Sequence, residues 1–198
     1  MATSSLYTSP FDVSAGTTVK AAVFNGRNMV LLPRHATISY DTSAPLQPAG
    51  SARTKTGLNW FGSLGAQSHA IATPTLLKQG QSTASTFDLS AIDTALGAHG
   101  QNYTAQYNGI LTIQTAGTYT FKLTSDDGSR LLIDDVVVID NDGPHPPTAV
   151  KGSVNLAAGS HKFDLRYFQL GGGTDLELTW TGPGFSETAL GPGSFTRS

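Results

Sequence analysis

The chemistry that this sequence could carry is concentrated in one acidic stretch of its second half. Six of the 14 Asp and Glu residues in the 198-residue chain fall between Asp126 and Asp142, with Arg130 as the only Lys or Arg among them. Carboxylates crowded in this way repel one another unless water solvates them or a cation binds. Asp126 and Asp127 are adjacent, and Gly128 after them gives the backbone freedom to turn. The stretch therefore indicates either a cation site or solvated turns.

Calcium would suit such a stretch, because Ca²⁺ takes roughly six to eight hard oxygen ligands. Asp-Asp-Gly is also a common hairpin turn, and both interpretations stay open. Asp134-Asp135, between two apolar residues, is typical of a solvent-facing turn. The segment 140–143 resembles part of a calcium loop, but it lacks the spaced later ligands of a helix–loop–helix site. We interpret that segment as a plain loop.

The sequence offers little for catalysis. It has no Cys, which excludes disulfides, thiolate metal ligands and Cys nucleophiles. We find no nucleophile elbow, no His-Glu zinc motif and no phosphate-binding Gly loop. A glycosidase needs two carboxyl groups on opposite sides of a bond, about 5 Å or more apart, and adjacent residues such as Asp126 and Asp127 are poor candidates. Asp164 or Asp175 combined with Asp126 stays open on the sequence, but we predict that the chain is not an enzyme.

Composition narrows the partners and the location. Charged residues make up 13% of the chain and the formal net charge is −2, so there is no sign of the basic stripe that nucleic-acid binding needs. No run of about 18 apolar residues occurs, which predicts no membrane span. The start of the chain has no apolar signal core, so the chain is either cytosolic or a piece of a longer secreted protein. Its low charge and high Gly content resemble extracellular β modules, and we expect a secreted or cell-surface protein.

The elements that must position the acidic stretch are strands. Apolar and polar residues alternate over 118–124, 161–167 and 175–180, which predicts half-buried strands. The continuous apolar run 136–139 indicates a strand covered on both faces. Turn residues recur about every 8–12 residues, and this spacing predicts an all-β fold, an antiparallel β-sandwich. The segment 90–96 is predicted to form a helical turn capped by its first residue, Ser90.

The first quarter of the chain differs from the rest. The alternating segment 18–24, followed by an Asn-Gly pair, predicts a β-hairpin. The segment 45–51, with two Pro and one Gly, has the composition of a linker. We therefore divide the chain into residues 1–50, which hold leading strands or a fragment of an Ig-like module plus the linker, and residues 51–198, which hold the main domain.

Several motifs of the second half occur in a recognisable order. They are Asn108-Gly109-Ile110-Leu111, Ala116-Gly117-Thr118-Tyr119-Thr120-Phe121, Ser125-Asp126-Asp127-Gly128-Ser129-Arg130-Leu131-Leu132-Ile133-Asp134, Val138-Ile139-Asp140-Asn141, Leu156-Ala157-Ala158-Gly159-Ser160-His161 and Leu176-Glu177-Leu178-Thr179-Trp180. Together they resemble the PA-fourteen domain, a family that takes its name from anthrax protective antigen and includes flocculins, epithelial adhesins and bacterial adhesin lectins. The resemblance covers about residues 56–185 and implies a sugar-binding β-sandwich. Residues 7–11 and 17–24 resemble the closing strands of the Ig-like domain beside chitobiase catalytic domains.

The resemblance also implies a binding site. Lectin members of the family hold a Ca²⁺ ion between two loops, the first of which carries two aspartates joined by a cis peptide bond. In this sequence those positions match Asp126 and Asp127, and the second loop matches 168–175. The further ligands implied are the Gln169 side-chain oxygen, the carbonyls of Gly171 and Gly173, and Asp175. A bound sugar would complete the calcium shell with two vicinal hydroxyls, so calcium would act as a bridge and not as a catalyst.

The sequence departs from some members of the family. Flocculin-like members often carry Asn where this chain has Gln169, and the chain lacks the Cys residues of the fungal lectins, so it looks closer to the bacterial members. Sugar contacts are expected from Asp126, Asp127 and Gln169. Phe168 either stacks on a sugar ring or belongs to the core, and His145 either touches a ligand or rests on its loop.

The function predicted at this point is a calcium-dependent carbohydrate-binding module that recognises a monosaccharide or glycan terminus. It would be an adhesin head or the targeting domain of a larger protein. The alternative is a structural or interaction module without a sugar site, and a variant of it retains calcium only for stability.

Overall fold

The described part of the chain falls into two units. The computed structural model describes residues 23–25, 28–30, 55–70 and 78–197. The units divide after Tyr40. In the first, β1 (Val23–Asn25) and β2 (Asn28–Val30) pair antiparallel as a hairpin. The remainder of the predicted leading module and the linker at 45–51 lie outside the described residues.

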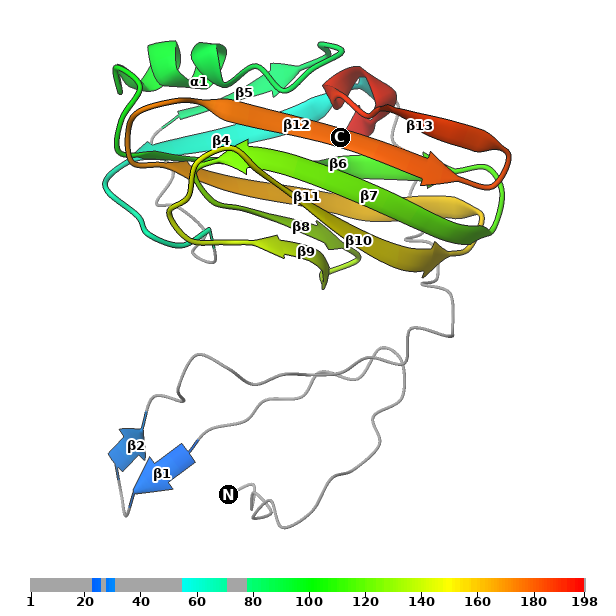
Figure 1. The fold of residues 1–198 in the computed structure, drawn as a ribbon, viewed down its shortest axis with the longest axis horizontal. Helices are drawn as coiled ribbons and strands as arrows, with labels where there is room; N and C mark the ends of the chain where they lie inside the picture. Colours follow the sequence, from blue (N-terminus) through cyan, green and yellow to red (C-terminus); the bar gives the residue numbers. More distant parts are fainter. Residues whose placement is uncertain (1–22, 26–27, 31–54, 71–77, 198) are drawn as a thin grey trace. The chain divides into compact units, whose positions relative to one another are not determined.

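The second unit is built from antiparallel strands. They are β3 (Lys55–Thr56), β4 (Leu58–Leu64), β5 (Lys78–Ser82), β6 (Tyr103–Ile113), β7 (Gly117–Asp126), β8 (Ser129–Ile133), β9 (Val136–Asn141), β10 (Thr148–Leu156), β11 (Gly159–Gln169), β12 (Asp175–Gly182), β13 (Phe185–Ala189) and β14 (Thr196–Arg197), with a 3-10 turn at Pro192–Ser194. The smaller sheet has the order β10-β7-β12-β13. The larger has the order β3-β14-β6-β11-β8-β9, and β4 joins it through β6 while β5 pairs with β4. The smaller sheet lies in front of the larger in Figure 1, which confirms the predicted antiparallel β-sandwich.

The alternation that predicted the strands also builds the core. Tyr119, Phe121 and Leu123 of β7 are buried between the sheets, as are the alternating apolar residues of β11. Side chains of one strand point in turn to opposite faces, so every second residue faces the other sheet. The expectation for the run 136–139 was wrong. That run lies in β9, at the edge of the larger sheet, where Val137 is 47% exposed, so only one face of the strand is covered.

The single described α-helix, α1 (Leu89–Leu96), lies where a helical turn was predicted, but its cap is different. Asp88, not Ser90, is the N-cap, and its carboxylate accepts a hydrogen bond from the Ser90 backbone N–H at 3.0 Å. The hydrogen bond that the Ser90 hydroxyl donates to the same carboxylate lowers the pKa of Asp88. None of the helices among the described residues is long and apolar enough to cross a membrane.

Three connections pass from one sheet to the other at the same end of the sandwich, on the left in Figure 1. They are the β7–β8 connection at 127–128, the β9–β10 connection at 142–147 and the β11–β12 connection at 170–174. The strand register brings them together. Asp126 lies opposite Asp175 in the smaller sheet. Ser129 lies opposite both Asn141 and Tyr167 in the larger sheet.

The β8–β9 turn differs in one respect from its prediction as solvent-facing. Asp134 and Asp135 both have positive φ angles, +50° and +67°, which Asp tolerates better than most residues. Asp135 is exposed, but the Asp134 carboxylate accepts a hydrogen bond from Lys162 N–H at 2.7 Å and contacts His161 Nδ1 at 2.7 Å. Asp134 therefore fastens the turn to β11.

His161 is fully buried, and both of its ring nitrogens face acceptors. Nδ1 contacts Asp134 and Nε2 lies 2.9 Å from the Ala157 carbonyl oxygen. Only a doubly protonated ring can donate to both. Burial opposes this charge, but the Asp134 carboxylate and the Ala157 carbonyl outweigh it and raise the pKa of His161 above its ordinary value.

We expect Asp134→Asn to weaken the fold in a pH-dependent way. A group whose pKa is raised on folding stabilises the protein below its unfolded pKa, about 6.5 for His, and this contribution is lost as pH rises through the folded pKa. At about pH 6 the variant should lose roughly 1–3 kcal/mol in the free energy of unfolding, and the deficit should shrink above the raised pKa. Denaturant unfolding across this range measures it, with Asp135→Asn as the matched control. An equal deficit at every pH would contradict the His161 assignment.

Candidate functional site

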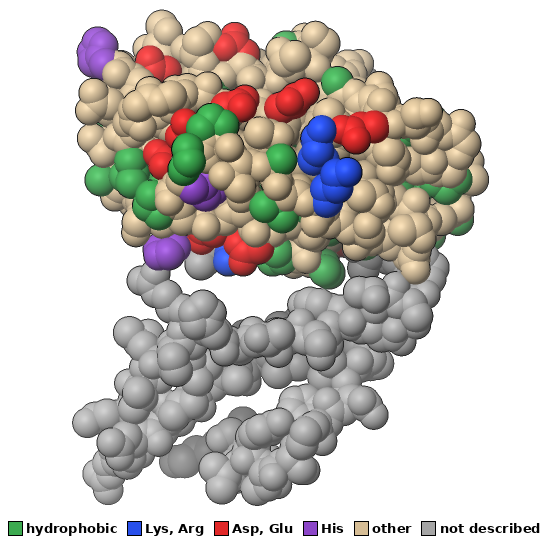
Figure 2. Space-filling view, in the orientation of Figure 1, with side chains coloured by type: hydrophobic (Ala, Val, Ile, Leu, Met, Phe, Trp, Pro, Cys, Tyr) green, Lys and Arg blue, Asp and Glu red, His purple; other side chains and the backbone are tan. Residues whose placement is uncertain are grey.

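The Asp126-Asp127 pair lies where the chain leaves the smaller sheet for the larger. Asp126 is the last residue of β7 and Asp127 begins the crossing, and each is only 7% exposed. The peptide bond between them is cis, as the resemblance implied. Both side chains therefore belong to the end of the sandwich where the three connections meet. Figure 2 shows acidic side chains at this end and also elsewhere on the visible face.

The Asp127 carboxylate joins the three connections. Its Oδ2 accepts a hydrogen bond from the Leu170 backbone N–H at 2.9 Å, in the β11–β12 connection. Its Oδ1 accepts a longer one from the His145 backbone N–H at 3.3 Å, in the β9–β10 connection. Asp127 thus has a structural role whether or not an ion is bound.

The Asp126 carboxylate is placed differently. Its side chain accepts no hydrogen bond from the described residues, although it is nearly as buried as a core residue. Burial, followed by the charges of Asp127 and Asp175, raises the pKa of Asp126 against an opposing effect of His145. Among the described residues, only Arg197 has fully buried side-chain atoms without a hydrogen-bond partner, so the Asp126 oxygens still reach solvent. Carboxylate oxygens that the protein leaves unpaired at an accessible position are suited to a cation.

Gln169, the last residue of β11, is fully buried beside this pair. Its side-chain oxygen accepts a hydrogen bond from Asp127 N–H at 3.1 Å and lies 2.8 Å from the Tyr167 hydroxyl. Its side-chain nitrogen donates to the Gly173 carbonyl at 2.6 Å. An amide oxygen has two lone pairs, and in Gln169 both already face hydrogen-bond donors, so the side chain connects the two loops without an ion. To ligate an ion, this oxygen would give up one of these two contacts.

The other predicted residues divide into two groups. Gly173 lies against the pair, because a Cβ added to it would be 2.8 Å from Asp126 Oδ2, and Asp175 lies opposite Asp126 in the β7–β12 register. A Cβ on Gly171 would instead meet Gln101 at 3.6 Å. The structure therefore places Gly173 and Asp175 beside the carboxylates. A side chain at position 171 would point towards Gln101 instead.

The side chains of the two predicted sugar contacts outside the metal set, Phe168 and His145, are held by contacts within the protein. Phe168 is fully buried and packs on Gly128, where an added Cβ would lie 2.4 Å from its ring. This corrects the sugar-stacking assignment and leaves the core alternative, since the connections cover the outward-facing end of β11. The His145 ring nitrogens lie 2.9 Å from the carbonyl oxygens of Asn141 and Pro146, so the ring is held by its own loop. Burial opposes its charge, but these carbonyls and the two carboxylates raise the pKa of His145.

Some residues of the site were missed as site residues. The Tyr167 hydroxyl donates a hydrogen bond to the backbone carbonyl oxygen of Asp126. The Asp142 carboxylate accepts a hydrogen bond from the Ala70 backbone N–H at 2.6 Å. The Asn141 amide nitrogen donates to the Thr148 carbonyl at 3.0 Å, which holds the start of β10. Asn141 and Asp142 lie in the segment 140–143, which resembles part of a calcium loop but was interpreted as a plain loop, and the signal at Tyr167 is a hydroxyl on an otherwise apolar inward-facing set of residues.

Comparison with known proteins places the fold. A family model described as the PA14 domain matches residues 56–193, more than half of the chain. This chain belongs to the PA14 domain family. No curated protein sequence matches it. The match begins at residue 56, where the PA-fourteen resemblance also begins, and continues beyond residue 185 to residue 193.

Solved structures share this PA14 fold at low identity. A PA14 sugar-binding domain from an RTX adhesin is 20% identical with a TM-score of 0.60, and the match covers 73% of this chain and 100% of that one. The epithelial adhesin 6 A domain from Candida glabrata, in complex with Galβ1-3GlcNAc, is 15% identical with a TM-score of 0.54, covering 76% and 90%. An anti-sigma factor domain-containing protein is 17% identical with a TM-score of 0.61, and the chain spans 50% of its length.

The oxygen donors of this PA14 domain are compatible with calcium. Within the described ranges, no three acidic, His or Cys side chains converge as a metal cluster. The set instead combines two buried carboxylates with amide and carbonyl oxygens, which are the hard ligands that Ca²⁺ accepts. Asp126, without a hydrogen-bond donor, supports this fit best.

A pair of glycine substitutions tests the PA14 loop directly. In Gly173→Ala the new methyl group would overlap Asp126 Oδ2, whereas in Gly171→Ala it would make an ordinary contact. We expect Gly173→Ala to weaken calcium binding at least about tenfold, or 1.4 kcal/mol, and Gly171→Ala to leave it within about twofold. Calcium titration by calorimetry measures both affinities. Equal affinities in the two variants would contradict the expectation that Gly173 borders a calcium site.

Proposed function

We propose that this PA14 domain is a non-catalytic, calcium-dependent carbohydrate-binding module. The observation that carries the proposal is the carboxylate of the largely buried residue Asp126, which lies beside Asp127, accepts no hydrogen bond from the described residues and still reaches solvent. Negative charge placed there is costly in the absence of a cation. A negative charge at this accessible end of the sandwich has a use if it binds a cation that in turn binds a ligand.

The ion would be held by the two loops of the site. The ligands we assign are the carboxylates of Asp126 and Asp127, the side-chain oxygen of Gln169, the carbonyls of Gly171 and Gly173, and Asp175. Bound calcium would supply coordination positions for two vicinal hydroxyls of a hexose. The protein's own groups fix the arrangement, because Asp127 and Gln169 connect the loops by hydrogen bonds.

The biological setting proposed here follows from the relatives. The RTX adhesin domain is described as sugar-binding, and the Candida glabrata domain was solved with a disaccharide. We therefore propose that this domain is an adhesin head or the targeting domain of a larger secreted or surface protein, and that its partner is a carbohydrate. In this proposal Asp126 and Asp127 bind the ion and do not cleave a bond of the carbohydrate.

Calorimetric titration with simple hexoses, in calcium and in chelator, tests the proposal. Single-site affinity should be weak, on the order of millimolar, or about −4 kcal/mol, and a glycan array should retain the protein more strongly because display in many copies adds avidity. Unchanged sugar binding in chelator would remove the calcium mechanism.

One observation favours a second candidate, an interaction module that keeps calcium only for stability. Asp127 and Gln169 already join the three connections by hydrogen bonds. In this case calcium would raise the melting temperature through ligand linkage, while no glycan on an array would be retained. Both candidates therefore predict that calcium raises the melting temperature, but only the first predicts that a glycan array retains the protein.

A further inference from the structure

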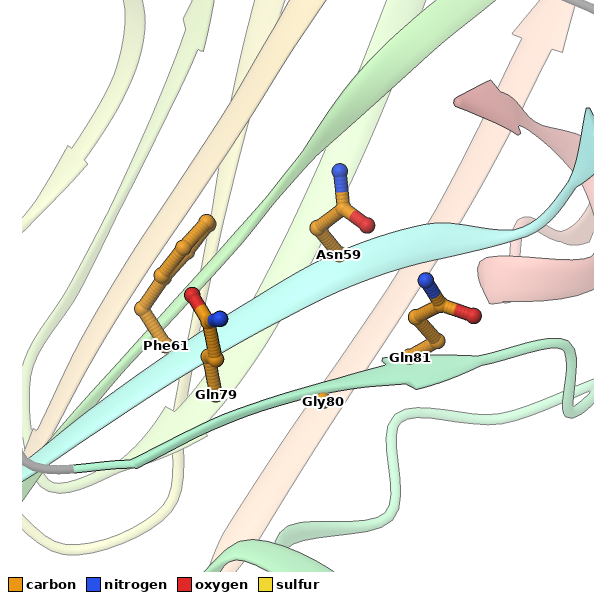
Figure 3. Close-up of a pocket in the computed structure, with 5 residues that line it drawn as sticks. All are labelled: Asn59, Phe61, Gln79, Gly80 and Gln81. Atoms are coloured by element: carbon orange, nitrogen blue, oxygen red, sulfur yellow. The ribbon is translucent and has the colours of Figure 1, made fainter. Parts of the chain in front are cut away.

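A hollow lies on the larger sheet, on strands other than those that carry the two loops of the proposed calcium site. It has a volume of about 520 Å³, and the described residues that line it are Asn59, Phe61, Gln79, Gly80 and Gln81. Figure 3 shows the side chains of Asn59 and Phe61 on β4, and of Gln79 and Gln81 on β5, rising from the same face of the two strands. We call these four residues the amide face.

The register fixes the spacing of the amide face. Asn59 lies opposite Gln81, and Phe61 lies opposite Gln79. Directly opposed residues in an antiparallel pair have Cβ atoms about 5 Å apart, and alternate residues along a strand are about 7 Å apart. The four side chains therefore form a small rectangle with an aromatic ring at one corner and an amide at each of the others.

The other side of the same strands makes this platform firm. Trp60 is buried in the core and packs on Gly80, where an added Cβ would lie 2.4 Å from its ring. β5 pairs with β4 alone among the described strands, so one side of the amide face is open. The side chains can thus be reached by a ligand while their backbone is held by the core.

The hydrogen-bonding groups of the amide face are unused. None of the three amides has a side-chain hydrogen bond with the described residues, and Gln79 and Gln81 are exposed. Each amide offers donors and an acceptor, which is the complement of a hydroxyl pair. Phe61 is partly exposed and offers an apolar face to C–H groups. The five lining residues carry no charge, which favours a neutral ligand over a phosphate or an acidic one.

We propose that the amide face is a second, calcium-independent site that binds a neutral oligosaccharide chain. Several amides beside one aromatic ring match the alternating hydroxyl and C–H faces of sugar rings better than they match an apolar peptide. The open side at β5 lets a chain of rings extend beyond the hollow. This proposal goes beyond the calcium site, because it uses different strands and no ion.

Side-chain amide NMR signals of the full chain give the test. The probes are the hexaoses of glucose in β-1,4 and α-1,4 linkage, and those of xylose, mannose and N-acetylglucosamine in β-1,4 linkage, each in excess chelator. We expect at least one hexaose to shift the NH₂ signals of Asn59, Gln79 and Gln81. The variant Phe61→Ala, and separately Asn59→Ala with Gln81→Ala, should reduce that affinity at least about tenfold.

Two controls separate this result from the calcium proposal. Gln114→Ala removes an exposed amide elsewhere and should leave the hexaose affinity unchanged, as should Asp126→Asn. Melting curves identify any variant that fails to fold. If Phe61→Ala fails to fold, the double variant Asn59→Ala with Gln81→Ala provides the test, and the reverse also holds. If no hexaose shifts the three amides in chelator, or if folded variants bind as the parent does, the amide face is not a saccharide site. Neither result bears on calcium-dependent hexose binding.

Discussion

Asp126→Asn should abolish most calcium binding while leaving the protein without calcium at least as stable as the parent. The substitution removes one anionic oxygen from the proposed ligand set, and ligand charge sets calcium affinity over orders of magnitude. We expect the dissociation constant to rise at least about 30-fold, or 2 kcal/mol. No hydrogen bond from a described residue to the Asp126 side chain is lost, because none is present.

The sign of the stability change distinguishes this variant from an ordinary destabilising one. Burial and the neighbouring acids raise the pKa of Asp126, so its ionised form is disfavoured in the folded protein. A neutral amide relieves that repulsion. The melting temperature in chelator should therefore stay level or rise, while the increase produced by calcium in the parent should nearly vanish.

Calorimetry and melting curves, each with calcium and with chelator, check the expected result. Asp127→Asn is an instructive companion, because its carboxylate accepts hydrogen bonds from Leu170 and His145. That variant should lose calcium affinity, keep the fold and lose some stability even in chelator. An Asp126→Asn protein with undiminished calcium affinity would refute the ligand assignment, and so would a large loss of stability without calcium.

Gly128→Ala should be the most damaging single substitution at this end of the sandwich. An added Cβ would lie 2.4 Å from the Phe168 ring and within 2.8 Å of the Gly143 backbone. Neither neighbour is the end of a flexible side chain, so two connections would have to move apart. Overpacking of this kind costs about 3 kcal/mol, which should lower the melting temperature by roughly 6–12 °C.

Thermal unfolding of Gly128→Ala beside Gly171→Ala provides the comparison, because the added methyl group makes only ordinary contacts at position 171. The double variant Gly128→Ala with Phe168→Leu should recover part of the loss and not all of it, since the clash with Gly143 remains. A Gly128→Ala protein that melts with the parent would show that the connections are looser than the packing indicates.

The sequence was sufficient for the strands, because their signal is local. Residues alternate over 118–124, 161–167 and 175–180, and a pleated strand sends successive side chains to opposite faces wherever it lies. The acidic pair followed by glycine was equally visible, and the family motifs around it pointed to the correct family. The position of β9 was not visible, because the same apolar run suits a central or an edge strand.

The family resemblance named the two loops of the site, but tertiary structure decided how their side chains meet at the end of the sandwich. In the alternation of β11, Phe168 is on the face that points away from the other sheet. The sequence could not show that Gly128 and Gly143 would cover it. In the same way, only the pairing of β7 with β12 and of β8 with β11 brings Asp126 beside Gly173. Alternation is a property of one strand, whereas burial at its end depends on which distant segments cross there, and that is fixed by the register of both sheets together.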